Sequence, residues 1–173
     1  MRNPRRIAGM LLVGLVSALL SVAVAQPAYA DGPLTLVNQT NGFCLQPEGD
    51  FYGALVRQSP CVPGQANQLW YTIGTGTPGY FLLQNAASAH LCMDVRDGIN
   101  ANGTLIQLWG CNGSDSMTWR RSHVYMNIYK MVSKIGQKCL DGWDPYQYPP
   151  RTKLWECTKG NGNYSQQWDL RVG

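Results

Sequence analysis

Two pairs of side chains in this sequence have the types and the spacing to bind a small polar ligand. Asp94 stands two positions after a cysteine and Trp109 two positions before the next one, and Asp141 and Trp155 repeat this arrangement further along the chain. A carboxylate accepts two hydroxyl groups at once, and an indole ring offers a flat apolar face. Each pair therefore combines a hydrogen-bond acceptor with a stacking surface.

The residues around Trp109 alternate as in a β-strand. Ile106 and Leu108 point to one side of this segment, and Gln107 and Trp109 point to the other. If the aliphatic side faces the core, Gln107 and Trp109 are presented together on the outside, where an amide and a ring can share one ligand. Asn112, just past the closing cysteine, is a further candidate polar contact.

The second pair is an altered version of the first. Trp155 alternates with Leu154 on its predicted strand, and Lys153 occupies the position that Gln107 has in the first pair. Gln166 lies downstream and completes the set of candidate ligand contacts. We expect a binding site here with a different preference.

Each of these side chains also has an ordinary structural interpretation. Asp94 and Asp141 stand where an aspartate can bond its own turn backbone. Trp109 and Trp155 are large enough to be packing residues, although strand alternation favours exposure for both. The other large indoles are expected to pack in the core: Trp70, Trp119 and Trp168.

The candidate residues belong to a threefold internal repeat with a period just under 50 residues, at about 34–73, 80–122 and 129–172. Each repeat has an apolar strand-like run, a pair of cysteines and a closing tryptophan. No segment shows helical periodicity, and Gly and Asn turns separate about twelve short strands. Three such units predict an all-β fold, a β-trefoil of three pseudo-symmetric repeats, rather than a propeller, which typically needs at least four blades.

The first 30 residues have the pattern of an export signal. Arg2, Arg5 and Arg6 precede an apolar stretch and the small-x-small sequence Ala28-Tyr29-Ala30. Cleavage there leaves 31–173 as one secreted domain with no membrane insertion; a membrane-spanning helix is the alternative, which the Gly and Ser residues of the stretch disfavour. Removing the three arginines lowers the formal charge from +4 to +1, which argues against nucleic acid as a partner.

All six cysteines lie in 31–173, and an even number in an exported chain predicts disulfides. Pairing within each repeat closes three loops of similar length, with separations of 17, 19 and 18 positions: Cys44 with Cys61, Cys92 with Cys111, and Cys139 with Cys157. Zinc sites instead use closely spaced cysteines or clustered histidines. The cysteines are far apart and the only histidines are His90 and His123, so we expect no metal and no cofactor.

The three repeats carry motifs of a known family. A Gln-x-Trp motif stands as Gln68-Leu69-Trp70 and Gln166-Gln167-Trp168, and the second repeat has Met117-Thr118-Trp119 in its place. A Cys-Leu-Asp element appears as Cys92-Met93-Asp94 and Cys139-Leu140-Asp141, and as Cys44-Leu45-Gln46 in the first repeat. With three such units in register over essentially the whole mature chain, the sequence resembles the ricin-type β-trefoil lectin family.

This resemblance implies carbohydrate binding. In such lectins the aspartate after the first cysteine accepts hydrogen bonds from sugar hydroxyls, and the aromatic residue before the second cysteine stacks on the sugar ring. The most complete site is then in the second repeat, and the third repeat holds an altered one. The first repeat has Gln46, Arg57 and Ser59 at the corresponding positions, so we expect no ordinary sugar site there.

Three classes of function are compatible with an exported β-trefoil. A glycosidase needs two carboxylates roughly 5–10 Å apart, whereas Asp94 and Asp141 belong to different repeats, so we expect no enzyme activity. A protein-binding or inhibitor module is the alternative, because the fold alone does not determine function. The leading hypothesis is a secreted, monomeric lectin that binds a polysaccharide or glycan; the sequence leaves the sugar open.

Overall fold

Short extended segments separated by turns make up the whole described part of the chain. The structure, a computed structural model, describes residues 32–173, and the predicted signal sequence lies outside them. These residues form twelve β-strands and four single-turn 3-10 helices, with no α-helix. No helix in this part of the chain has the length and apolar character needed to cross a membrane.

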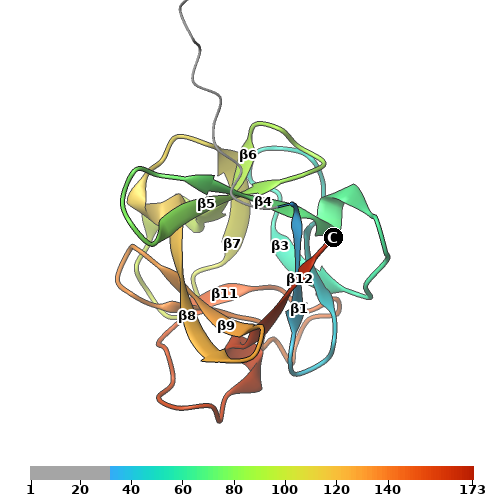
Figure 1. Cartoon of the computed structure of the whole chain (residues 1–173), viewed down its shortest axis with the longest axis vertical. Helices are drawn as coiled ribbons and strands as arrows, with labels where there is room; N and C mark the ends of the chain where they lie inside the picture. The colour runs from blue at the N-terminus through green and yellow to red at the C-terminus, as the bar shows by residue number, and fades with distance from the viewer. Residues whose placement is uncertain (1–31) are drawn as a thin grey trace, which may run out of the picture.

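Six of the strands in residues 32–173 close into a barrel (Figure 1). Each pairs antiparallel with the next, and the last returns to the first, so that the first and last strands of the described residues lie side by side. In ring order these strands are β1 (Leu34–Asn38), β4 (Trp70–Gly74), β5 (Tyr80–Asn85), β8 (Thr118–Tyr125), β9 (Ile128–Ser133) and β12 (Trp168–Val172). A closed ring leaves no barrel edge open to pairing with another chain.

The other six strands of this region form three hairpins, one per repeat. They are β2 (Cys44–Pro47) with β3 (Val56–Ser59), β6 (Leu91–Val95) with β7 (Ile106–Gly110), and β10 (Cys139–Asp141) with β11 (Lys153–Trp155). Each hairpin pairs with one barrel strand and is bridged to both of the other hairpins, through Leu55–Gln107, Leu105–Lys153 and Arg57–Arg151. The predicted β-trefoil of three pseudo-symmetric repeats is therefore confirmed.

The closing tryptophans form the centre of the core, as predicted. Trp70, Trp119 and Trp168 are fully buried, together with aliphatic residues of all three repeats. Each indole N–H donates to the backbone carbonyl of the residue after the first cysteine of its repeat, at 3.0, 3.1 and 3.1 Å. A buried N–H needs such a partner, so each tryptophan ties the barrel to its own hairpin.

Disulfides fasten each hairpin at the point where it meets the barrel. They join the predicted partners within each repeat, with Cα–Cα separations of 5.0, 5.1 and 5.0 Å: Cys44–Cys61, Cys92–Cys111 and Cys139–Cys157. Closing loops of this length stabilises a fold by about 3 kcal/mol each in the chain-entropy description. Residues 32–173 hold no free cysteine and no cluster of side chains arranged to bind a metal.

Three of the 3-10 helices stand just before the closing tryptophans. They are η1 (Ala66–Gln68), η3 (Asp115–Met117) and η4 (Tyr164–Gln166). The last residue of each helix stands two positions before the tryptophan, and its side chain lies toward the hairpin of its own repeat: Gln68, Met117 and Gln166. The fourth, η2 (Arg96–Gly98), follows β6 and has no counterpart in the other repeats of the described chain.

Candidate functional site

The glutamine of the Gln-x-Trp motif links the hairpin to the loop beyond the second cysteine. In the third repeat, Gln166 Nε2 donates to Asp141 Oδ2 at 3.0 Å, and Gln166 Oε1 accepts the backbone N–H of Thr158 at 2.9 Å. In the first repeat, Gln68 makes the same contacts, to Gln46 Oε1 at 2.7 Å and from the Val62 N–H at 2.8 Å. The motif thus fixes the side chain at the aspartate position, and Gln166 acts through Asp141.

The second repeat reaches a similar arrangement with different residues. Met117 replaces the glutamine, and the backbone N–H of Asn112 donates a hydrogen bond to the Met117 sulfur at 3.3 Å. Asp94 is held instead by Ser116 Oγ, which donates to Oδ1 at 2.6 Å, and by Gln107 Nε2, which donates to Oδ2 at 2.9 Å. The structure thereby makes Ser116 a partner of the carboxylate.

Asp94, Gln107, Trp109, Asn112 and Ser116 line one open depression, the repeat 2 hollow, with a volume of about 280 Å³. Ile106 and Leu108 are fully buried, as strand alternation predicted. Gln107, expected to be exposed, is 6% exposed, because its amide bonds Asp94 and its backbone bridges to Leu55 of the first hairpin.

Trp109 is 44% exposed, which leaves its ring available to a ligand. Tyr52 of the first repeat packs edge-on against it, with ring centroids 5.3 Å apart and planes at 85°. This contact supports the indole from one side. Asn112 lies in the hollow; its Oδ1 accepts the backbone N–H of Ser114 at 2.9 Å, so its amide NH₂ and one further lone pair of Oδ1 remain for a ligand.

Burial raises the pKa of Asp94 above its ordinary value of 3.8; the hydrogen bonds from Ser116 and Gln107 oppose this shift, and the nearby charge of Asp97 adds to it. In the folded protein the neutral acid is therefore favoured relative to the unfolded chain. The contribution of Asp94 to the free energy of unfolding is fully present below pH 3.8 and is lost as the pH rises through the raised pKa.

We therefore expect Asp94→Asn, which cannot titrate, to gain stability relative to wild type as the pH rises. The measurement is the difference in thermal unfolding midpoint between the two proteins, followed by circular dichroism from pH 3 to 7. A difference that stays constant over this range, or that moves toward wild type as the pH rises, would contradict the raised pKa.

The third repeat holds a larger depression, the repeat 3 hollow, lined among others by Asp141, Trp143, Lys153, Trp155 and Tyr164, with a volume of about 510 Å³. Asp141 is 4% exposed, and its Oδ1 accepts the Trp143 backbone N–H at 2.7 Å. It thus closes a turn of its own backbone and also lines the hollow. Trp155, Trp143 and Tyr164 expose 41%, 55% and 56% of their surfaces.

Several residues that line or support the hollows come from parts of the chain that local pattern did not single out. Thr40 of the first repeat reaches the repeat 3 hollow, and Tyr52 of the same repeat supports Trp109 in the second. Trp143 lies two positions beyond Asp141, just after β10. Tyr164, two positions before Gln166, carried no signal beyond its proximity to the motif.

In the first repeat the positions equivalent to the site residues are otherwise engaged. Gln46 Oε1 accepts from Gln68, and Arg57 forms an ion pair with Glu48 at 3.7 Å. Ser59 stands where the other repeats have an indole. The absence of an ordinary sugar site in this repeat stays a prediction.

The repeat motifs agree with the comparison to known proteins. A family model described as ricin-type beta-trefoil lectin domain-like matches residues 26–109 and 66–147. The chain belongs to this family. No curated protein matches it.

Solved structures share the lectin-like β-trefoil fold. The designed threefold-symmetric protein ThreeFoil is 26% identical, with a TM-score of 0.72 over 81% of this chain and 98% of its own. An exo-beta-1,3-galactanase from Clostridium thermocellum is 22% identical, with a TM-score of 0.73 over 82% of this chain and 30% of its own. Polyporus squamosus lectin, bound to Neu5Aca2-6Galb1-4GlcNAc, is 18% identical, with a TM-score of 0.68 over 84% of this chain and 50% of its own. This ricin-type domain therefore spans half or less of the last two proteins.

Proposed function

We propose that this ricin-type chain is a secreted, monomeric, non-catalytic lectin that binds carbohydrate at the hollows of the second and third repeats. The proposal assigns binding to Asp94, Gln107, Trp109 and Asn112 in one hollow, and to Asp141 and Trp155 in the other, where the fully buried Gln166 positions Asp141. One observation carries it: in both hollows a buried carboxylate, held by fixed donors, lies with a partly exposed tryptophan.

Each buried carboxylate keeps acceptor capacity after its protein contacts are made. Asp94 and Asp141 each accept one hydrogen bond per oxygen within the protein, and a carboxylate oxygen has two lone-pair sites. Two neighbouring sugar hydroxyls can therefore donate to one aspartate while the C–H face of the ring lies on the indole. Open sites of this kind typically bind sugars in the millimolar to micromolar range, about −4 to −8 kcal/mol.

Two sites on separate hairpins favour binding to repetitive ligands. When one hollow holds a polymer, the second binds it at an increased effective concentration, so that avidity exceeds the affinity of either site. We therefore expect tighter binding to a polysaccharide than to its monosaccharide.

The placement of the carboxylates supports binding rather than hydrolysis. The two buried aspartates line different hollows, whereas a glycosidase needs a pair roughly 5–10 Å apart. Asp97, which shares the repeat 2 hollow, is exposed and pairs with Arg96 at 3.7 Å. We expect no release of reducing sugar from any glycan that the protein binds.

Export is the second part of the proposal. Three disulfides in residues 32–173 suit an oxidising compartment, and the sequence of the first 30 residues has the pattern of a cleaved signal. We propose that 31–173 is the mature secreted domain.

The decisive experiment is retention on a broad panel of immobilised polysaccharides. We expect the wild-type protein to bind at least one, and Trp109→Ala and Trp155→Ala each to weaken binding at their own site by about tenfold, which corresponds to about 1.4 kcal/mol. Tyr125→Ala is the matched control, because Tyr125 is similarly exposed, at 40%, on the barrel strand β8. No retention on any glycan would remove the lectin proposal.

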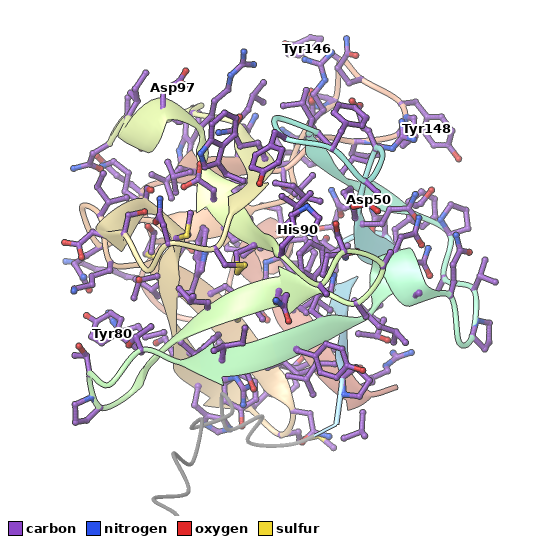
Figure 2. The ribbon with its side chains drawn as sticks, turned by 90° about the horizontal axis from the view of Figure 1, so that it is seen from above. Asp50, Tyr80, His90, Asp97, Tyr146 and Tyr148 are labelled. Atoms are coloured by element: carbon purple, nitrogen blue, oxygen red, sulfur yellow. A yellow bond between two sulfur atoms is a disulfide. The ribbon has the colours of Figure 1, made fainter. Side chains whose placement is uncertain are left out.

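An exposed aromatic loop supports the protein-binding alternative. Tyr146 and Tyr148 are 89% and 79% exposed, and Figure 2 shows both extending from the surface of the molecule. Exposed tyrosines are enriched in protein interfaces. If the panel gives no binding, this loop is the first surface to test against proteins, by comparing wild type with Tyr146→Ser.

A further inference from the structure

The two proposed sites differ at one equivalent position. In the antiparallel hairpins, Gln107 is the register partner of Asp94, and Lys153 is the register partner of Asp141. Gln107 and Lys153 are each followed by a leucine and then by the tryptophan of the site. The repeats therefore form a natural comparison in which a neutral amide is replaced by a cation.

Gln107 is committed to its own site, whereas Lys153 is not. The Gln107 amide donates to Asp94 and is almost fully buried. Lys153 is half-buried, and within residues 32–173 it forms no ion pair with a carboxylate. Asp141 is held instead by the Trp143 backbone and by Gln166. The Lys153 ammonium is therefore available to an anion.

Lys153 also lies against the proposed stacking ring. Its Nζ is 5.3 Å from the centroid of the Trp155 ring, and both side chains line the repeat 3 hollow. A cation over an indole face at a partly exposed site is held only by a weak attraction. A ligand that offers an anionic group can draw the ammonium away from the ring and take its place on the indole, whereas a neutral sugar must displace it without that compensation.

Packing and a strand bridge hold the backbone at Lys153 in place. Leu154 beside it is fully buried, and Lys153 itself is bridged to Leu105 of the second hairpin. Only the flexible end of the lysine has to move on binding. The nearby Lys138 already has a carboxylate partner, Glu156, at 3.9 Å.

We propose that the repeat 3 site prefers acidic saccharides, in which a sugar ring stacks on Trp155 while its carboxylate or sulfate group contacts Lys153. This inference rests on the proposed lectin function and deepens it, because it gives the two sites different ligand classes. The repeat 2 hollow, with Gln107 in the equivalent place, binds neutral sugar.

The test uses pairs of polysaccharides that differ in acidic groups: galactan and polygalacturonate, xylan and glucuronoxylan, dextran and dextran sulfate. The acidic member carries carboxylates in the first two pairs and sulfate in the third, so the three pairs show which of the two anionic groups the site binds. Binding is measured for the full domain and for Trp109→Ala. This substitution weakens the repeat 2 site, so that the remaining binding reports mainly on the repeat 3 site. We expect Trp109→Ala to bind an acidic member about tenfold more tightly than its neutral partner, with the preference falling at high salt.

Lys153→Gln copies the residue of the second repeat and is expected to remove this preference, while Lys153→Arg keeps it. Lys159→Gln is the matched control, because it removes the same charge from an exposed residue outside the hollow. If Lys153→Gln and Lys159→Gln change the acidic-to-neutral ratio equally, or if neither changes it while glycans are still bound, the inference is wrong and the lectin proposal stands. Binding to no glycan at all overturns both.

Discussion

Replacing Trp168 with alanine is expected to lower the free energy of unfolding by about 3–5 kcal/mol, the usual range for removing a large buried aromatic side chain. Trp168 is fully buried in the core, and its indole N–H donates to the Leu140 carbonyl at 3.1 Å. The substitution leaves a cavity and also an unsatisfied carbonyl in the third hairpin. A loss of this size is a large part of the 5–15 kcal/mol that stabilises a typical domain.

Chemical denaturation followed by far-UV circular dichroism measures this loss. Trp155→Ala is the matched control, because it removes the same side chain from an exposed position of the same repeat; it is expected to change stability by less than about 1 kcal/mol. Trp168→Phe, which keeps most of the volume but loses the hydrogen bond, should fall between the two. Equal destabilisation by Trp168→Ala and Trp155→Ala would contradict the central role of Trp168.

The double substitution Asp94→Asn with Asp141→Asn is expected to abolish glycan retention while the fold is preserved. Asparagine has nearly the same shape, but its neutral amide is a weaker acceptor for sugar hydroxyls than a carboxylate. Hydrogen bonds to charged groups contribute about 1.5–3 kcal/mol, so each site loses about tenfold or more in affinity. Because the bivalent gain is lost as well, retention on a polymer should fall further than binding of a short oligosaccharide.

Affinity electrophoresis in gels that contain the polysaccharide measures the effect, with circular dichroism as the check on folding. Gln46→Ala is the matched control, because Gln46 occupies the same position in the first repeat, where we predict no sugar site. Each single substitution, Asp94→Asn or Asp141→Asn, should give an intermediate result. Full retention by the double variant would show that the aspartates are not the binding groups.

The fold could be predicted from the sequence because it depends on features that recur. The three closing tryptophans and the three cysteine pairs each occupy equivalent places, and one repeat buries its apolar face only by packing against the others. Trp70, Trp119 and Trp168 accordingly lie together in the core. The alternation around Leu108 also showed correctly which side of β7 is buried.

The details of the two hollows could not be predicted in the same way, because they depend on contacts between residues far apart in the chain. Gln107 was expected to be exposed, and its burial results from the bridge to Leu55 in another repeat. Ser116 became a partner of Asp94 only through the turn of η3. Local alternation shows which face of a strand a side chain occupies but not what covers that face.

The sequence by itself therefore determined the repeat, the disulfide pairing, the tryptophan core and the aspartate–tryptophan pairs, since each depends on residue type and regular spacing. Only the tertiary structure decided how these pairs differ. It placed Tyr52 against Trp109, brought Thr40 to the repeat 3 hollow and left Lys153 beside Trp155 without a carboxylate partner in residues 32–173. The physical reason is that the barrel brings the three hairpins together at one set of bridges, so each hollow is completed by neighbours that sequence spacing does not reveal.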